Sequence, residues 1–229
     1  MVYFLIIILF ITFLIVSLWY YKKVWFYRDP KRVPPTGENI ILSPTDGNIV
    51  YMKEFKNGRV VSKKKNEEIE ISEITKVSND GGGWIIGIYM KPTDVHFNYA
   101  PIKGEIKQIV YTGSKFNLPM VDIWEYINFV FLHRVINLWS KKFHWQNERN
   151  TIFLENKDLK IVIVEIADKF VNKIDCFVRE GENLKSGQKI SFIKRGSQVD
   201  LVVFKKELDF QVEVGDQVHG AITILAEYK

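Results

Sequence analysis

The stretch Ile190-Ser-Phe-Ile-Lys-Arg-Gly-Ser-Gln-Val-Asp-Leu-Val-Val203 indicates the fold class of this chain. In its second half, apolar Val199, Leu201 and Val203 alternate with polar residues. Strict alternation of this kind is typical of a half-buried β-strand, because successive side chains of a strand point to opposite faces. The stretch therefore predicts a β-strand that begins near residue 197.

Two residues at the start of this strand could carry chemistry. Gly196 permits backbone geometry that other residues avoid, and Ser197 follows it directly. A serine at such a corner could attack the backbone as a nucleophile. Most Gly-Ser pairs are only turns, so this interpretation depends on two further segments, Ser43-Pro-Thr-Asp-Gly47 and Asp94-Val-His-Phe-Asn98.

Most of the chain after residue 39 consists of short apolar or alternating runs bounded by Gly, Pro and Asn, which favours an all-β sandwich or barrel-like domain. The runs are 40–42, 47–52, 84–90, 104–111, 151–154, 159–166, 173–178, 189–193, 198–204 and 221–226. Two internal echoes predict a compact, partly duplicated β fold. Pro44-x-x-Gly-x-Ile49 matches Pro101-x-x-Gly-x-Ile106, and Gly181-Glu-Asn-Leu184 matches Gly215-Asp-Gln-Val218.

Residues 120–142 break the β pattern. They contain no Gly or Pro, and their apolar residues recur at steps of three and four, which predicts one amphipathic helix. Two roles are open for its apolar face. The face could pack on the β core, or its aromatic residues could rest on a membrane. The aromatic residues concerned are Trp124, Phe129, Phe131 and Trp139.

The N-terminus predicts a membrane anchor. Val2–Tyr21 carries no charged residue and is long enough to cross the roughly 30 Å apolar core of a bilayer. No basic residue precedes it, whereas Lys22 and Lys23 follow at once, so the positive-inside rule places the rest of the chain in the cytoplasm. A cleaved signal peptide is the competing interpretation, but no small-residue cleavage site follows the apolar run.

The sequence thus predicts a single-pass protein of the cell membrane. Residues 1–21 form the transmembrane anchor, 22–38 a basic, proline-rich linker, and 39–229 one catalytic domain. The net charge of +5 and pI of about 9.0 suit a domain held against an anionic membrane surface. The basic residues are too dispersed to indicate nucleic-acid binding. Cys176, the single cysteine, cannot form an internal disulfide and is expected to be buried.

The candidate acid–base residues are few. His96 lies where an apolar strand ends, a position close to the core yet reachable. Asp46 lies in a turn, where an aspartate could simply bond its own backbone. The other histidines, His133, His144 and His219, are interpreted as surface or packing residues. No metal is expected, since His-x-His, His-Glu-x-x-His and a second cysteine are all absent from the sequence.

Taken together, these segments resemble the phosphatidylserine decarboxylase proenzymes of the short, pyruvoyl-dependent type. The matching pieces occur in the order of that family and cover nearly all of the chain after the apolar segment. They are Phe26-Tyr-Arg-Asp-Pro30 with Arg32, Ser43-Pro-Thr-Asp-Gly47, Tyr89-Met-Lys-Pro-Thr-Asp-Val-His-Phe-Asn98 with Ala100-Pro101, Asn147-Glu-Arg-Asn150, and Arg195-Gly-Ser-Gln-Val-Asp-Leu201.

The resemblance implies that the chain makes its own cofactor. The Ser197 hydroxyl would attack the carbonyl of Gly196, and β-elimination from the resulting ester would cut the chain between them. A pyruvoyl group derived from Ser197 would then begin the small chain 197–229, which would stay with chain 1–196 as a heterodimer. The implied reaction is decarboxylation of phosphatidylserine to phosphatidylethanolamine, with the pyruvoyl carbonyl as electron sink.

By the same resemblance, His96 would be the acid–base residue, and Asp46 would orient and stabilise a histidine. Some family members carry a second histidine three residues after the first, where this chain has Tyr99. If that histidine is the self-cleavage base, then Tyr99, His96 or another group must replace it. The helix predicted at 120–142 is longer than the short type usually carries, which could change lipid access.

Two other functions stay open from the sequence. The chain could be a membrane-tethered β-domain that binds or scaffolds without cleaving itself, an alternative that the change to Tyr99 favours. It could also be a pyruvoyl enzyme that decarboxylates another amino-acid headgroup.

Overall fold

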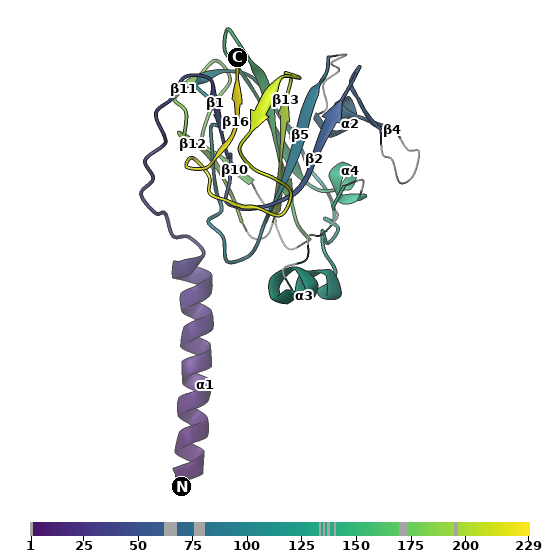
Figure 1. The fold of residues 1–229 in the computed structure, drawn as a ribbon. Helices are drawn as coiled ribbons and strands as arrows, with labels where there is room; N and C mark the ends of the chain where they lie inside the picture. The colour runs from purple at the N-terminus through teal and green to yellow at the C-terminus, as the bar shows by residue number, and fades with distance from the viewer. Residues whose placement is uncertain are drawn as a thin grey trace.

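The computed structural model describes residues 2–61, 68–75, 81–132, 134, 136, 138–139, 141–169, 174–194 and 197–229. An apolar helix precedes a mainly β domain and projects away from it (Figure 1). The helix comprises α1 (Val2–Tyr20) and one π-helical turn, η1 (Tyr21–Trp25). The stretch Val2–Trp25 is long and apolar enough to cross a membrane, and none of it is buried in the domain.

An eight-stranded antiparallel sheet forms the body of the domain and curls into a half-barrel (Figure 1). Its strands, in spatial order, are β11 (Asn183–Leu184), β7 (Gly104–Thr112), β8 (Arg149–Glu155), β9 (Lys160–Ala167), β13 (Ser197–Val203), β5 (Gly83–Met90), β2 (Gly47–Phe55) and β15 (Gln217–Val218). These bounds confirm the predicted mainly β fold.

Among the described residues, two three-stranded sheets and one hairpin accompany the large sheet. One small sheet consists of β1 (Ile40–Leu42), β16 (Ile224–Tyr228) and β14 (Leu208–Phe210), and the other of β10 (Ile174–Cys176), β12 (Lys189–Ile193) and β6 (Phe97–Tyr99). The hairpin pairs β3 (Arg59–Val61) with β4 (Glu68–Glu70), and the short helix α2 (Ile71–Thr75) follows it.

The predicted duplication is a property of the fold. At one end of the large sheet β11 pairs with β7 through Leu184 and Gly104, and at the other β15 pairs with β2 through Val218 and Gly47. The two turns that carry the echoed motifs also match, since Gly181 and Gly215 both take the positive φ that suits glycine. Ile106 N–H donates to the Glu182 carbonyl, and Ile49 N–H donates to that of Asp216 in the same way.

The two faces of the large sheet bury separate apolar clusters. Val199, Leu201 and Val203 of β13 pack with the two small sheets, whereas Val202 packs on the opposite face with residues of α2 and the segment around Trp139. All residues of β13 are therefore buried, and the prediction of a half-buried strand was wrong. Alternation in sequence marks the two faces but does not show that the polar one is covered.

The prediction of one helix over 120–142 was also wrong. The structure has α3 (Ile123–Leu132) and the separate turn α4 (Phe143–Gln146). Between them the chain folds back, so that the Lys141 ammonium reaches both the Glu125 carboxylate at 2.7 Å and the carbonyl of Met120. This return buries Leu138 and Trp139 in the second apolar cluster, and tertiary packing thus overrides the helical period.

The segment that follows η1 is fixed to the domain. Phe26 is 6% exposed, and the side chain of Arg32 is 7% exposed. Lys189 of β12 forms an ion pair with Asp29. The basic segment expected as a linker therefore contributes side chains to the interior.

Candidate active site

Ser197 begins the central strand β13 and is fully buried. It pairs with Met90 of β5 on one side and with Ala167 of β9 on the other. Its hydroxyl donates to the Met90 sulfur at 3.0 Å. Gly196, the other half of the predicted cleavage site, lies outside the described residues, so cleavage at this bond stays a prediction.

The Ser43–Gly47 turn lies beside Ser197. The Thr45 hydroxyl donates to the same Met90 sulfur at 3.2 Å, so one sulfur atom joins the turn to the serine. Gly47 is required here, because a Cβ on this residue would lie 2.4 Å from the Tyr89 carbonyl oxygen. Close packing of turn on strand therefore brings two of the predicted motifs together.

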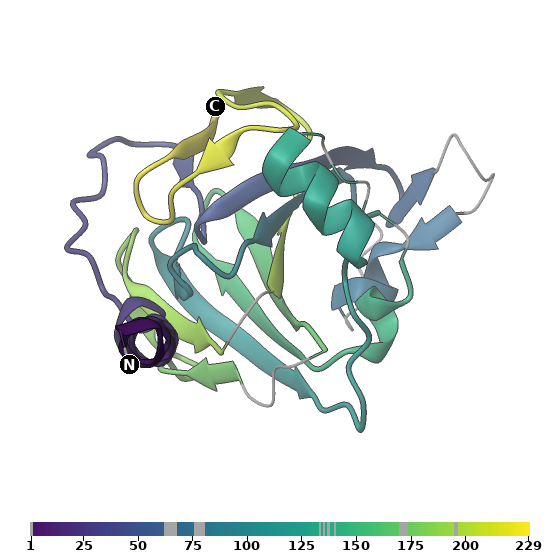
Figure 2. The same ribbon diagram turned by 90° about the horizontal axis from the view of Figure 1, so that it is seen from below.

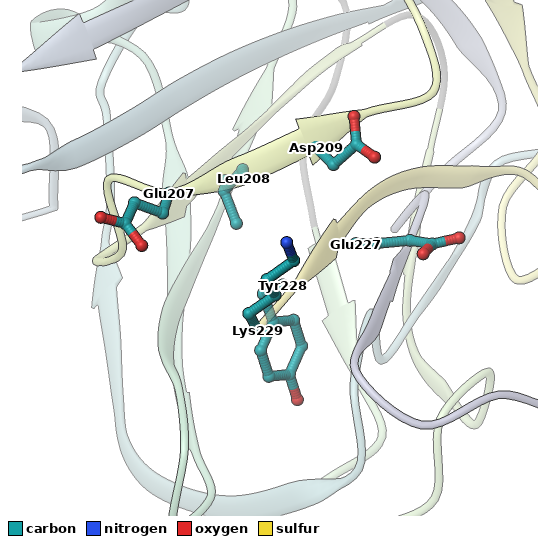
Figure 3. A pocket seen from close by; sticks show the side chains of 6 residues that line it. All are labelled: Glu207, Leu208, Asp209, Glu227, Tyr228 and Lys229. Carbon is teal, nitrogen blue, oxygen red and sulfur yellow. The ribbon is translucent and has the colours of Figure 1, made fainter.

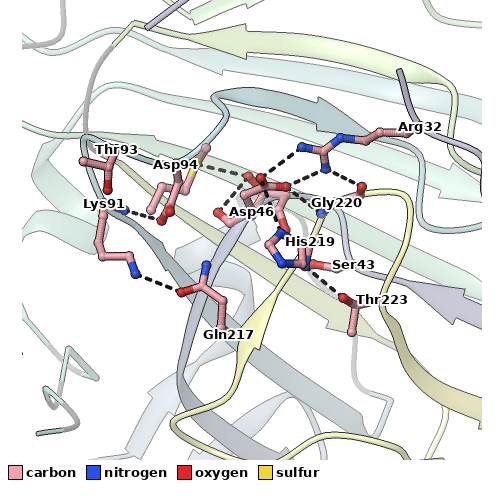
Figure 4. A network of polar contacts seen from close by, with 12 residues as sticks. Arg32, Ser43, Asp46, Lys91, Thr93, Asp94, Gln217, His219, Gly220 and Thr223 are labelled. Carbon is pink, nitrogen blue, oxygen red and sulfur yellow. Dashed lines mark hydrogen bonds and ion pairs between the residues drawn. The ribbon is translucent and has the colours of Figure 1, made fainter. Parts of the chain in front are cut away.

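Asp46 of this turn has an arginine as its partner (Figure 4). The Arg32 guanidinium donates to both carboxylate oxygens, at 2.5 and 2.9 Å, and both side chains are almost completely buried. The backbone N–H of Gly220 donates to Asp46 at 2.8 Å. His219 Nδ1 lies 3.7 Å from the carboxylate, although this imidazole is 59% exposed. The predicted role of Asp46, orienting a histidine, thus stays a prediction, and His219 is the imidazole beside it.

Tyr99 belongs to the same cluster. The Arg32 guanidinium lies over its ring, 4.9 Å from the centroid. The Tyr99 hydroxyl is buried and has no hydrogen-bond partner among the described residues. Burial raises the pKa of Tyr99 to about 12, so the phenol holds its proton at neutral pH. Tyr99 is therefore placed near the site in a state that does not accept a proton.

His96 is the buried imidazole of the site, with no exposed surface. Its Nδ1 lies 2.8 Å from the carbonyl oxygen of Asp94, which can only accept, so Nδ1 carries the proton. Its Nε2 is buried without a partner in the described part of the chain and holds a free lone pair. Burial lowers the pKa of His96 to about 4. The imidazole is therefore neutral at pH 7, with one nitrogen ready to accept a proton.

Backbone contacts connect the His96 segment to the chain on both sides of the predicted cleavage bond. Met90, at the end of β5, pairs with Ser197, and the chain continues from there to His96. The carbonyl of His96 also accepts from the N–H of Ile193 at 3.1 Å, at the end of β12. Ser197, Asp46 and His96 nevertheless make no direct hydrogen bond with one another in the described structure.

The end of the apolar helix packs directly on the His96 segment. The Phe26 ring lies 4.4 Å from the imidazole, between centroids. The Tyr21 hydroxyl donates to the carbonyl of Pro92 at 2.8 Å, and Arg28 donates to that of Thr93 at 2.5 Å. The candidate site is thus held at the end of the domain from which α1 extends.

Glu165 is a residue that the sequence reasoning missed. It is fully buried on β9 and accepts from Asn98 and Asn150, each at 2.8 Å, and also from the Ser191 hydroxyl. Burial raises the pKa of this carboxyl. Because Asn98 lies between His96 and Tyr99, the network ties β6 to the sheet that carries Ser197. A lone charged residue in the apolar run 161–167 was the available signal.

A second polar network lies on the opposite face of β13. The Tyr51 hydroxyl donates to Asp200 at 2.5 Å, and Gln198 donates to the same oxygen at 2.6 Å. His144, which was interpreted as a surface or packing residue, is 1% exposed, and its Nε2 lies 3.5 Å from Asp200. Because positions 198 and 200 alternate with 197 and 199, this network faces away from Ser197 and braces the strand from behind.

Two further residues complete the comparison with the sequence. His133 lies outside the described residues. Cys176 was expected to be buried but is exposed at the end of β10. An apolar run predicts a strand, but it does not show which of the strand's side chains are exposed to solvent.

A cavity of about 340 Å³ lies at β14 and β16, and Figure 3 shows the side chains that line it. Its lining residues come from β14 and the residue before it, from β16 and from the chain end: Glu207, Leu208, Asp209, Glu227, Tyr228 and Lys229. The C-terminus lies at the end of the domain opposite α1 (Figure 1). The cavity therefore lies apart from the predicted site at Ser197.

Fold and site together describe a β domain whose candidate acid–base residue, His96, is buried beside the end of an apolar helix. The sequence comparisons give the family: the model described as phosphatidylserine decarboxylase matches residues 23–226. The chain therefore belongs to the phosphatidylserine decarboxylase family, a family of carboxy-lyases, as its motifs predicted.

Curated relatives cover most of the chain. A protein of Methanocaldococcus jannaschii named putative archaetidylserine decarboxylase proenzyme is 34% identical over 203 residues, which are 89% of this chain and 88% of that protein. The phosphatidylserine decarboxylase proenzyme of Carboxydothermus hydrogenoformans is 29% identical over 94% of this chain and 84% of its own. That of Ralstonia nicotianae is 30% identical over 88% of this chain and 76% of its own.

Proposed function

We propose that this protein cleaves itself before Ser197 and then decarboxylates phosphatidylserine to phosphatidylethanolamine at a membrane surface. The observation that carries the proposal is the buried, unpartnered Nε2 of His96, on the chain segment that follows Met90, whose backbone pairs with the buried Ser197 at the start of a central strand. A neutral imidazole can accept the proton that a serine hydroxyl must lose in order to attack.

The proposed self-cleavage needs only the chain itself and one water molecule. The Ser197 Oγ bonds to the Gly196 carbonyl carbon and the Gly196–Ser197 C–N bond breaks, which gives an ester and a free amine. Loss of the Ser197 Cα proton and of the Cβ–Oγ bond then releases the Gly196 carboxylate and leaves a dehydroalanine. Tautomerisation and hydrolysis consume one water, release ammonia and leave a pyruvoyl group at residue 197. His96 is the proposed proton acceptor, and Tyr99, which keeps its proton, is not.

The residues present fit a pyruvoyl group at residue 197: Ser197, its precursor, is buried with its hydroxyl on the Met90 sulfur, and His96 Nε2 is a buried polar atom that no described residue satisfies. The group would supply the electrophilic carbonyl that withdraws electrons as CO₂ leaves. His96 would hold or return the proton at Nε2. The Arg32–Asp46 pair would fix the Ser43–Gly47 turn beside residue 197.

The sheet would hold the two products of cleavage together. Chain 197–229 would begin with β13, which pairs along its whole length with β5 and β9 of chain 1–196. A central strand with two neighbours keeps its hydrogen bonds when one peptide bond at its start is broken. We therefore infer a stable heterodimer of the two chains.

We further infer that α1 anchors the protein in the cell membrane with the domain in the cytoplasm. Lys22 and Lys23 are exposed at the domain end of the helix, where the positive-inside rule favours cytoplasmic residues. The contacts of Phe26, Tyr21 and Arg28 with the His96 segment then hold the site close to the lipid headgroups.

The test is decarboxylation by the purified full-length protein in vesicles. Phosphatidylserine labelled at the serine carboxyl should release labelled CO₂, and Ser197→Ala should release none. Archaetidylserine is the competing lipid because the Methanocaldococcus relative is named for it. A faster reaction with archaetidylserine than with phosphatidylserine would change the proposed substrate, and no CO₂ from either would contradict the activity.

A further inference from the structure

We propose that α3 is a second membrane contact, which lies in the surface of the same bilayer that holds α1. This inference rests on the anchoring by α1 proposed above. Its partner is the headgroup region of a bilayer that contains anionic lipid.

The first observation is that α3 presents apolar side chains on two sides. Phe129 faces the domain, where it is 9% exposed and its ring lies 5.6 Å from that of Tyr89. Ile123, Trp124 and Leu132 face outward and are 76%, 73% and 56% exposed. A helix on the surface of a soluble domain has a polar outer face, so an outer face of this kind marks an interaction surface.

The second observation is where α3 lies. Figure 1 shows it at the end of the domain from which α1 projects, and the view from below in Figure 2 has α1 end-on with α3 on the same face. A bilayer that contains α1 therefore faces the outer side of α3. Trp and Leu on a helix parallel to the surface are typical of interfacial helices.

The third observation is that one segment contacts both helices. Residues 89–96 meet the end of the anchor through the carbonyls of Pro92 and Thr93 and through His96. The same segment meets α3 through the ring of Tyr89 and through Lys91, whose ammonium lies 5.9 Å from the centre of the Phe129 ring. With two membrane contacts, this segment would face the bilayer between α1 and α3.

The charges around α3 agree with this partner. The loop before the helix exposes Lys115 next to Phe116, which is 86% exposed. Arg134 and Lys142, after the helix, are also exposed. Cations beside exposed aromatic side chains suit the interface of an anionic membrane. The helix itself is held in place by the Glu125–Lys141 ion pair and by Asp122, which accepts from the Glu125 N–H at 2.7 Å.

The test uses the full-length protein in proteoliposomes of phosphatidylcholine and phosphatidylserine. In a Cys176→Ser background, Trp124→Cys carries an environment-sensitive fluorophore. Lys229→Cys, at the opposite end of the domain, is the matched control. The label at residue 124 should be blue-shifted and quenched by a nitroxide-bearing lipid, whereas the label at 229 should be neither. Equal, water-like emission and no quenching at both positions would overturn the inference.

Decarboxylation measured in the same proteoliposomes distinguishes a failure of this inference from a failure of the proposed function. Trp124→Ser with Leu132→Ser should slow decarboxylation of vesicle phosphatidylserine several-fold and leave that of a monomeric short-chain phosphatidylserine unchanged. Equal loss on both lipids would contradict a membrane contact. Failure of the protein to float with vesicles would contradict the anchoring, and a quenched label without CO₂ release would contradict only the proposed activity.

Discussion

Asp46→Asn tests the ion pair that holds the Ser43–Gly47 turn. The Arg32 and Asp46 side chains are 7% and 8% exposed, so the substitution leaves a guanidinium buried without its counter-charge. Removing one partner of a buried pair costs about 3–5 kcal/mol. For a domain of this size, about 2–4 °C of Tm accompany each kcal/mol, so Tm should fall by about 6–20 °C.

The assay is thermal unfolding of the full-length protein in detergent, followed by near-UV circular dichroism. All variants carry Ser197→Ala, so that differences in processing do not enter the comparison. Three variants are compared with the parent: Asp46→Asn, Arg32→Met and the double variant that carries both substitutions. Because each single substitution leaves one buried group unpaired, the double variant should lose less stability than the two losses added together.

Two results would refute this reasoning. Additive losses would show that Arg32 and Asp46 are not coupled. A Tm of Asp46→Asn within about 1 °C of the parent would show that the pair contributes nothing to the fold, against the several kcal/mol expected for a buried pair.

Two further predictions follow from buried groups in the Ser197→Ala background. Below pH 6.5 the unfolded chain protonates His96 while the folded chain does not until about pH 4, so stability should fall by about 3 kcal/mol across this window. His96→Gln should flatten this slope in urea unfolding, and an unchanged slope would exclude His96 as its source. Glu165→Leu should cost more stability than Glu165→Gln, since it removes the carboxylate that accepts from three buried donors, at about 1–3 kcal/mol for each donor left unsatisfied. Equal urea midpoints for the two variants would contradict the network.

Much of the fold could be predicted from local patterns. The apolar and alternating runs predicted the six longer strands of the large sheet. Its edge strands β11 and β15 lay only in the echoed motifs that begin at Gly181 and Gly215 and that predicted the duplication. The apolar stretch from Val2 likewise predicted a projecting helix. Family motifs singled out Ser197, Asp46 and His96, and in the structure the segments that carry them meet at Met90.

The remaining features depend on contacts that a single sequence does not display. Arg32 pairs with Asp46, which lies 14 residues further along the chain. The Glu165 carboxylate accepts hydrogen bonds from side chains of β6, β8 and β12. The helical period of 120–142 persists past residue 132, although packing of Leu138 and Trp139 ends the helix there. Burial of the polar face of β13 likewise depends on segments far away in sequence.

The most direct test of the central claim is the intact mass of the purified wild-type protein beside Ser197→Ala. Self-cleavage before Ser197 predicts that the 26.9 kDa chain is replaced by two chains, 1–196 and 197–229. The smaller chain should be lighter by one ammonia than the plain peptide and resistant to N-terminal sequencing. Ser197→Ala should keep its full mass. A wild-type chain that stays whole and yet releases CO₂ from phosphatidylserine would contradict the account.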